Sequence, residues 1–121
     1  MKYRKMLELV RALRSGKYRQ TSSRLRSHDK TEGKYGYCCL GVACRVVGKR
    51  FNKKGEVEGE RMYMPTSVRD YFGFCRKDGS PVDRGYIVVA GQEHASLASA
   101  NDSGFTFDQI ADAIKANWRR L

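Results

Sequence analysis

The sequence lacks long apolar runs, and its first half has very few acidic residues. No stretch approaches the roughly 20 consecutive apolar residues that a membrane-spanning helix needs. Residues 1–14 mix charges among their apolar positions and lack the apolar core of a secretory signal. We therefore expect a soluble, intracellular protein with no membrane partner, in which the four cysteines are reduced thiols.

The chain has 121 residues, of which 40% are hydrophobic and 11% aromatic. This is enough for one compact domain with its own core and too little for two. The patterns described below mix helical and strand periods. They predict a single small α+β domain over residues 1–121, with about three or four helices and a small, mostly antiparallel sheet.

Two segments of the first half favour helices. Residues 3–14 place Met6, Leu9, Val10 and Leu13 on one stripe, as in an amphipathic helix. The apolar run 37–47 predicts a short buried helix that begins near Cys38 or Cys39 and ends at Gly48. Its valines also permit a strand.

Two further helices are expected in the second half. Pro65 opens a short helix over residues 66–72. Residues 105–121 carry a capping box, in which Thr106 is the N-cap and Gln109 the third helical residue. We interpret the preceding 101–104 as a loop with strong turn propensity.

Strand signals are shorter. The turn residues at 52–55 predict a β-hairpin over residues 49–64, and the β-branched run 86–90 predicts a strand buried on both faces. Residues 17–36 are polar and basic, with Leu25 their single aliphatic residue. We expect this segment to be a long loop or arm.

The net charge of +11 is divided unevenly along the chain. Residues 1–54 carry 16 basic and 3 acidic residues, a net charge of +13, whereas residues 55–121 carry 8 and 10, a net charge of −2. A surface charged in this way attracts polyanions. We predict that the first half binds nucleic acid, or an acidic or nucleic-acid-bearing protein complex.

The residues expected to contact such a partner are basic side chains that neutralise phosphates and tyrosines that stack on bases. They are Lys17, Arg19, Arg24, Arg26, Lys30, Lys34, Lys49, Arg50, Lys53 and Lys54, together with Tyr18 and Tyr35. The sequence contains no recognition-helix, zinc-finger or RNA-binding-sheet signature. Contact with the nucleic-acid backbone is therefore favoured over reading of the base sequence.

The cysteines allow an enzymatic alternative. Cys39 is expected near a helix N-terminus, where the pKa of a thiol is lowered. His94 would then be the base, with Asn101 or Asp102 orienting it, in the chain order of papain-like enzymes. The local sequence does not match the papain signature, and buried cysteines that act as small hydrophobes are the simpler interpretation.

No cofactor or metal is predicted. Structural zinc sites place their ligands in two regularly spaced pairs. Here Cys38, Cys39 and Cys44 form one irregular cluster, and Cys75 stands alone. The glycine patterns of phosphate-binding and dinucleotide-binding loops are also absent.

Four segments, in this order, resemble a group of small accessory proteins encoded by tailed bacteriophages. They are ALRSGKYRQ (12–20), YCCLGVACRV (37–46), MPTSVRDYFGF (64–74) and SLASANDSGFTFDQIADAIKANW (96–118). The resemblance implies expression in the cytoplasm of the infected bacterial host and supplies no catalytic residue. Such accessory proteins often act by binding, for example by blocking a host enzyme or disarming a defence system.

The leading hypothesis is a non-enzymatic phage accessory protein. Its basic half would bind nucleic acid or a host nucleic-acid-handling complex and thereby inhibit host defence or transcription. One alternative is a small cysteine-dependent hydrolase or transferase that uses Cys39 and His94. Another is a sponge for a small anionic nucleotide signal, which would need a preformed pocket lined by a few Arg or Lys side chains.

Overall fold

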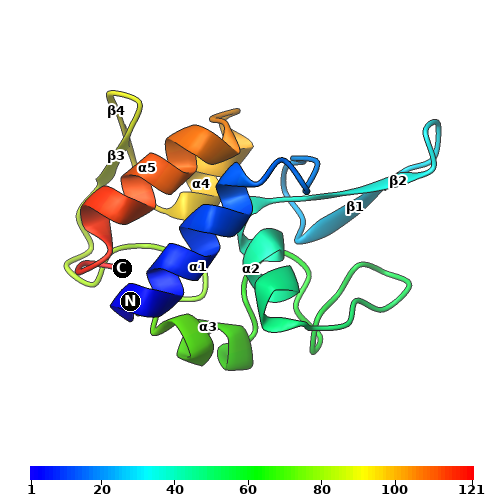
Figure 1. Cartoon of the computed structure of the whole chain (residues 1–121), viewed down its shortest axis with the longest axis horizontal. Helices are drawn as coiled ribbons and strands as arrows, with labels where there is room; N and C mark the ends of the chain where they lie inside the picture. The colour runs from blue at the N-terminus through cyan, green and yellow to red at the C-terminus, as the bar shows by residue number, and fades with distance from the viewer.

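The computed structural model describes residues 1–121 and confirms the expected small α+β fold. Five helices surround one core, and two separate two-stranded antiparallel sheets lie at its ends (Figure 1). In chain order the elements are α1 (Tyr3–Arg14), β1 (Arg26–Asp29), β2 (Lys34–Tyr37), α2 (Cys39–Val47), α3 (Thr66–Phe72), β3 (Ile87–Val89), β4 (Gln92–His94), α4 (Leu97–Asp102) and α5 (Phe107–Asn117).

The core is one cluster of 26 buried hydrophobic side chains. Helices α1 and α5 pack side by side along it, and α2 packs against α1, α3 and α4 (Figure 1). The expected stripe of α1 is confirmed, because Met6, Leu9 and Leu13 are all buried. No helix is both long enough and apolar enough to cross a membrane.

Helix α5 confirms the predicted capping box. The Thr106 hydroxyl accepts from the Gln109 backbone N–H at 3.2 Å, and the Gln109 side chain accepts from the Thr106 N–H at 3.0 Å. These bonds satisfy two N–H groups that the start of a helix leaves without partners. They begin a helix that packs against α1 and in which Ile110 and Ile114 are fully buried.

Helix α2 begins at Cys39, as expected, and lies against the chain that enters β1. A Cβ atom on Gly41 would come within 1.8 Å of the Leu25 carbonyl oxygen. The Leu25 side chain is itself completely buried. This close approach attaches the start of the β1–β2 hairpin to the central helix.

The Asn101 side chain attaches the start of α2 to the segment that precedes β1. Its buried side-chain oxygen accepts from the Cys39 backbone N–H at 3.1 Å and from Gln20 Nε2 at 3.0 Å. Its amide nitrogen donates to the Thr21 carbonyl at 2.8 Å. One side chain therefore links α4 to the start of α2 and to the segment that precedes β1.

The expected loop at 17–36 is corrected in its second half, which forms the β1–β2 hairpin. Figure 1 shows this hairpin projecting from one end of the molecule, with β3–β4 at the opposite end. The sequence gives little sign of it because β1 and β2 bury no aliphatic side chain. The hairpin is held by backbone bonds, since Tyr37 donates to the Arg19 carbonyl and accepts from the Thr21 N–H.

The hairpin predicted at 49–64 is wrong. This segment is a series of turns with a single bridge between Val57 and Glu60. Its backbone pairs with distant segments, because the Arg61 carbonyl accepts from the Leu25 N–H and the Met64 N–H donates to the Lys77 carbonyl. Because these backbone groups bond to distant segments, residues 49–64 do not pair with one another as the two strands of a hairpin.

Two expectations for the second half are also corrected. The strand at 86–90 is the shorter β3, and its Val88 is 54% exposed because β3–β4 is covered on one face only. Residues 101–104 are not all loop, since α4 extends to Asp102. This six-residue helix is capped by the Ser96 hydroxyl, which accepts from the Ser99 N–H.

The Gly41–Leu25 contact predicts the effect of one added methyl group. Gly41→Ala would drive Cβ into a backbone oxygen that cannot rotate away, and we expect it to lower the free energy of unfolding by about 3 kcal/mol. Gly85→Ala is the control, because its Cβ would meet only the ends of the Arg120 and Asp83 side chains, at 3.0 and 3.1 Å. Urea denaturation of both variants measures the difference, and equal losses would contradict this account.

Candidate polyanion-binding cleft

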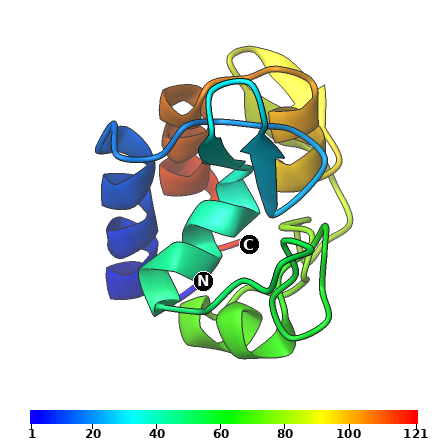
Figure 2. The same cartoon turned by 90° about the vertical axis from the view of Figure 1, so that its right-hand side faces the viewer.

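The β1–β2 hairpin and the loop after residue 50 project from the same end of the molecule (Figure 1), the end that faces the viewer in Figure 2. Between them lies a cleft of about 410 Å³, which we call the basic cleft. Its walls carry five basic residues and no acidic one. The lining residues are Arg24, Arg26, Ser27, His28, Lys30, Tyr35, Lys53, Lys54 and Gly55.

Arg26 is the most firmly held of these cations. Its guanidinium lies over the Tyr35 ring, 4.0 Å from the centroid, and 5.1 Å from the centroid of the Phe51 ring. Its Nη2 donates to the Asn52 carbonyl at 2.9 Å. Cation–π contacts and a single carbonyl bond fix the position of the group but leave its charge without a carboxylate partner.

The loop wall is shaped by Asn52 and Gly55. The Asn52 side-chain oxygen accepts from the backbone N–H groups of Lys54 and Glu56, at 3.0 and 2.9 Å, as in an Asx turn. Gly55 has φ +76°, and a Cβ there would come within 2.7 Å of the Arg26 carbonyl oxygen. The loop therefore packs directly against β1 and leaves Lys53 exposed at the cleft.

A second groove adjoins the basic cleft. It has a volume of about 440 Å³, and its lining includes Arg26, which the two depressions share. We call it the α2 groove, because it surrounds the C-terminal end of α2. Its lining residues are Arg26, Arg45, Gly48, Lys49, Arg50 and Phe51.

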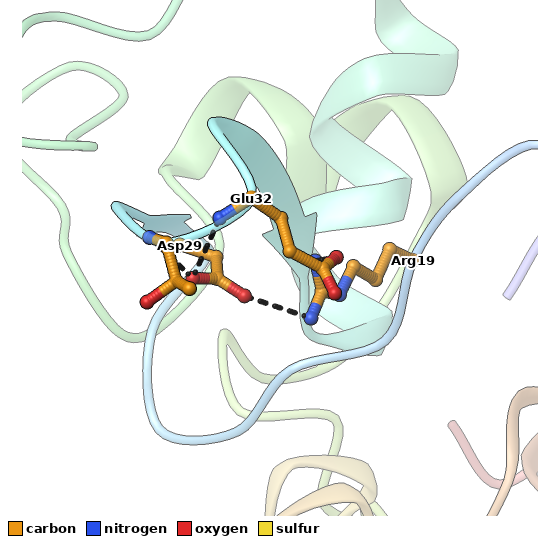
Figure 3. Close-up of polar contacts among 4 residues, drawn as sticks. Arg19, Asp29 and Glu32 are labelled. Carbon is orange, nitrogen blue, oxygen red and sulfur yellow. Dashed lines mark hydrogen bonds and ion pairs between the residues drawn. The ribbon is translucent and has the colours of Figure 1, made fainter.

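Arg19 is not brought to the cleft. It pairs with Asp29 at 2.9 Å and with Glu32 at 2.8 Å, near the turn of the hairpin (Figure 3). The backbone N–H groups of Thr31 and Glu32, together with Arg19, hold the pKa of the Asp29 carboxyl below its ordinary value. Arg19 thus neutralises the two acidic side chains of the hairpin.

Five other candidates lie outside the basic cleft. Lys17 and Tyr18 line a groove beside α1, and the Tyr18 ring packs edge-on against that of Tyr37. Lys34 begins β2 opposite Asp29. Lys49 and Arg50 lie in the α2 groove, and Lys49 pairs with Glu58 at 3.5 Å.

Six of the predicted residues therefore meet in the basic cleft: Arg24, Arg26, Lys30, Tyr35, Lys53 and Lys54. No ion pair forms with any of these five basic side chains.

The sequence analysis did not identify His28, whose ring lies 4.8 Å from that of Tyr35, or Arg45 of the α2 groove as binding residues. The two-residue spacing of Arg26 and His28 would have placed both on one face of a strand, had a strand been expected there.

The geometry around Cys39 opposes its role as a nucleophile. Cys39 is the first residue of α2, but burial raises the pKa of its thiol well above the ordinary value, and its Sγ lies 3.6 Å from the Leu97 carbonyl. Asn101 is occupied by the bonds described above. His94 is buried in β4 against the Phe105 ring, and its Nε2 has no hydrogen-bond partner.

The other buried cysteines behave in the same way. Burial raises the pKa of Cys38 to about 11 and that of Cys44 to about 12. All four cysteines are free thiols, and Cys75 is the exposed one. No group of three or more His, Cys, Asp or Glu side chains has the geometry to hold a metal ion.

The fold and the cleft together define a class: a small α+β domain that presents a concentrated basic surface at one end. Within that class, residues 1–118 match the family described as a domain of unknown function (DUF8296), and the chain belongs to this family. Neither a curated protein nor a solved structure matches the chain.

Thiol reactivity separates the two interpretations of the cysteines. At neutral pH we expect iodoacetamide to modify Cys75 first, and Cys38, Cys39 and Cys44 at least about 100-fold more slowly, because raised pKa values leave little thiolate. Mass spectrometry of a reaction time course measures each rate, and Cys75→Ser provides the control for site assignment. A Cys39 rate equal to that of Cys75 would restore the nucleophile hypothesis.

Proposed function

We propose that this protein is a non-enzymatic binding protein whose basic cleft engages nucleic acid. The observation that carries the proposal is the grouping of Arg24, Arg26, Lys30, Lys53 and Lys54 around one cleft that contains no carboxylate. Like charges held together repel one another, and a polyanion removes that repulsion while releasing its own counterions.

The form of the site supports contact with phosphates rather than with base edges. Its cations come from the hairpin, the segment that leads into it and a loop, and none belongs to a helix that could enter a major groove. Arg26 is positioned by aromatic rings, whereas Lys53 and Lys54 are exposed and have no ion-pair partner. Such a mixture suits a repeating phosphate backbone whose exact register does not matter.

In the biological setting that the phage resemblance implies, the target is nucleic acid of the infected bacterium or a host complex that carries it. Binding there would inhibit a defence or transcription function in the host cytoplasm. Affinity capture from infected cells, with and without nuclease, tests this proposal. If nuclease treatment abolishes the captured material, a nucleic-acid target is supported. If the captured material resists nuclease, the partner is a protein.

A second candidate function is the sequestration of a small anionic nucleotide. It is favoured by the volume of the basic cleft, about 410 Å³, which lies within the usual range of small-molecule sites. Tyr35 is the single hydrophobic residue of its lining, however, and most ligand pockets are largely apolar. A thermal shift with mononucleotides but none with oligonucleotides would favour this candidate over nucleic-acid binding.

Neutralising three cations of the cleft should weaken binding. For the variant R24Q/K53Q/K54Q we expect the affinity for a fluorescein-labelled oligonucleotide to fall at least about tenfold. We also expect the slope of log K against log salt to decrease in magnitude by about 2, because three phosphate contacts are lost. Fluorescence anisotropy at a series of salt concentrations measures both quantities.

The matched control is R84Q/K115Q/R119Q, which removes the same net charge from exposed residues remote in sequence from the cleft. We expect its affinity to stay within about threefold of the unmodified protein, since only long-range attraction is reduced. Equal losses in the two triple variants would show that total charge, and not the cleft, determines binding. Absence of any binding at low salt would reject the proposed function.

A further inference from the structure

We infer that the nucleic acid bound by this protein is a single strand, which runs from the basic cleft across Arg26 into the α2 groove. The inference rests on the proposed function and goes further, since it specifies the form of the ligand and its path. It is carried by the arrangement of two adjoining depressions around one fixed cation.

We interpret the two depressions as one basic track, because they share a lining residue. They share Arg26, and each adds cations of its own: Arg24, Lys30, Lys53 and Lys54 on one side, and Arg45, Lys49 and Arg50 on the other. Together they offer room on both sides of the shared guanidinium, about 410 and 440 Å³. A ligand with one or two phosphates would fill one depression, whereas an extended chain is needed to use both.

Aromatic rings accompany this track. Tyr35 lies in the basic cleft and is 47% exposed, and Phe51 lies in the α2 groove. Both rings also contact Arg26. A basic groove with aromatic rings beside it is the usual arrangement for binding single strands, whose bases are free to stack.

A duplex fits this surface poorly. Its major groove admits a two-stranded β-ribbon, and β1–β2 is the ribbon that this protein offers. The turn of that ribbon carries two carboxylates, Asp29 and Glu32, which leave its tip a net charge of only +1 when Lys30, Lys34 and the paired Arg19 are counted. The cations without carboxylate partners lie in the concave cleft instead, where we expect a thin, flexible strand to reach Arg26 and a rigid duplex to contact only the rims.

The experiment compares labelled oligothymidylates of about 4 and about 16 nucleotides with a duplex of the longer length, the lengths being chosen to span known single-strand sites. Oligouridylate of the longer length distinguishes RNA from DNA. By fluorescence anisotropy we expect the long single strand to bind at least about tenfold more tightly than both the duplex and the short oligomer.

Variants then locate the path. R45Q/R50Q should remove most of the advantage of the long strand and leave binding of the short one within about twofold, because only the α2 groove is altered. R84Q/R119Q is the control with the same loss of charge, and far-ultraviolet circular dichroism verifies that each variant is folded. Tyr35→Ala should weaken single-strand binding about tenfold or more, with little effect on any duplex binding.

The outcomes separate this inference from the proposed function. If the duplex binds as tightly as the single strand, or if R45Q/R50Q weakens short and long oligomers equally, the single-strand path is wrong while nucleic-acid binding stands. If no nucleic acid binds, both are wrong. A long strand that binds more tightly, with an advantage that depends on Arg45 and Arg50, supports the inference.

Discussion

The contact of Gly41 with the Leu25 carbonyl is the constraint on which the functional end of the molecule depends. It allows α2 to lie directly against the backbone at the base of the hairpin, and Asn101 reinforces the junction with three hydrogen bonds. Because a β-hairpin alone is marginally stable in water, β1–β2 needs this anchorage to the core. The hairpin then provides one wall of the basic cleft, and the loop at Gly55, packed on the same strand, provides the other.

Charge placement follows from that scaffold. Arg26 lies where the hairpin, the loop and the end of α2 meet, and aromatic contacts hold it without neutralising it. Arg19 has the opposite role, since it compensates Asp29 and Glu32 beside the turn. The protein thereby keeps carboxylates paired outside the cleft and leaves unpaired cations within it. Such a surface carries electrostatic repulsion that a bound polyanion relieves.

The helices were largely predictable from local patterns. The α1 stripe of Met6, Leu9 and Leu13 and the capping box of α5 depend on neighbours within one or two turns. The hairpins were not predictable in this way. β1–β2 lacks an alternating apolar pattern, and residues 49–64 have turn chemistry, but their backbone groups pair with Leu25 and Lys77. Hydrogen bonds between segments distant in sequence determine that β1–β2 forms a hairpin and that residues 49–64 do not. A local sequence pattern contains no information about such bonds.

The sequence by itself determined that positive charge is concentrated in residues 1–54 and that a helical core exists to carry it. Tertiary structure alone decided which cations act together. Arg24, Lys53 and Lys54 line one cleft, whereas Arg19 forms ion pairs elsewhere. Burial of Cys39 raises the pKa of its thiol, which therefore stays protonated. The physical reason is that charge interactions and desolvation depend on distance and burial in space, which packing sets and sequence separation does not.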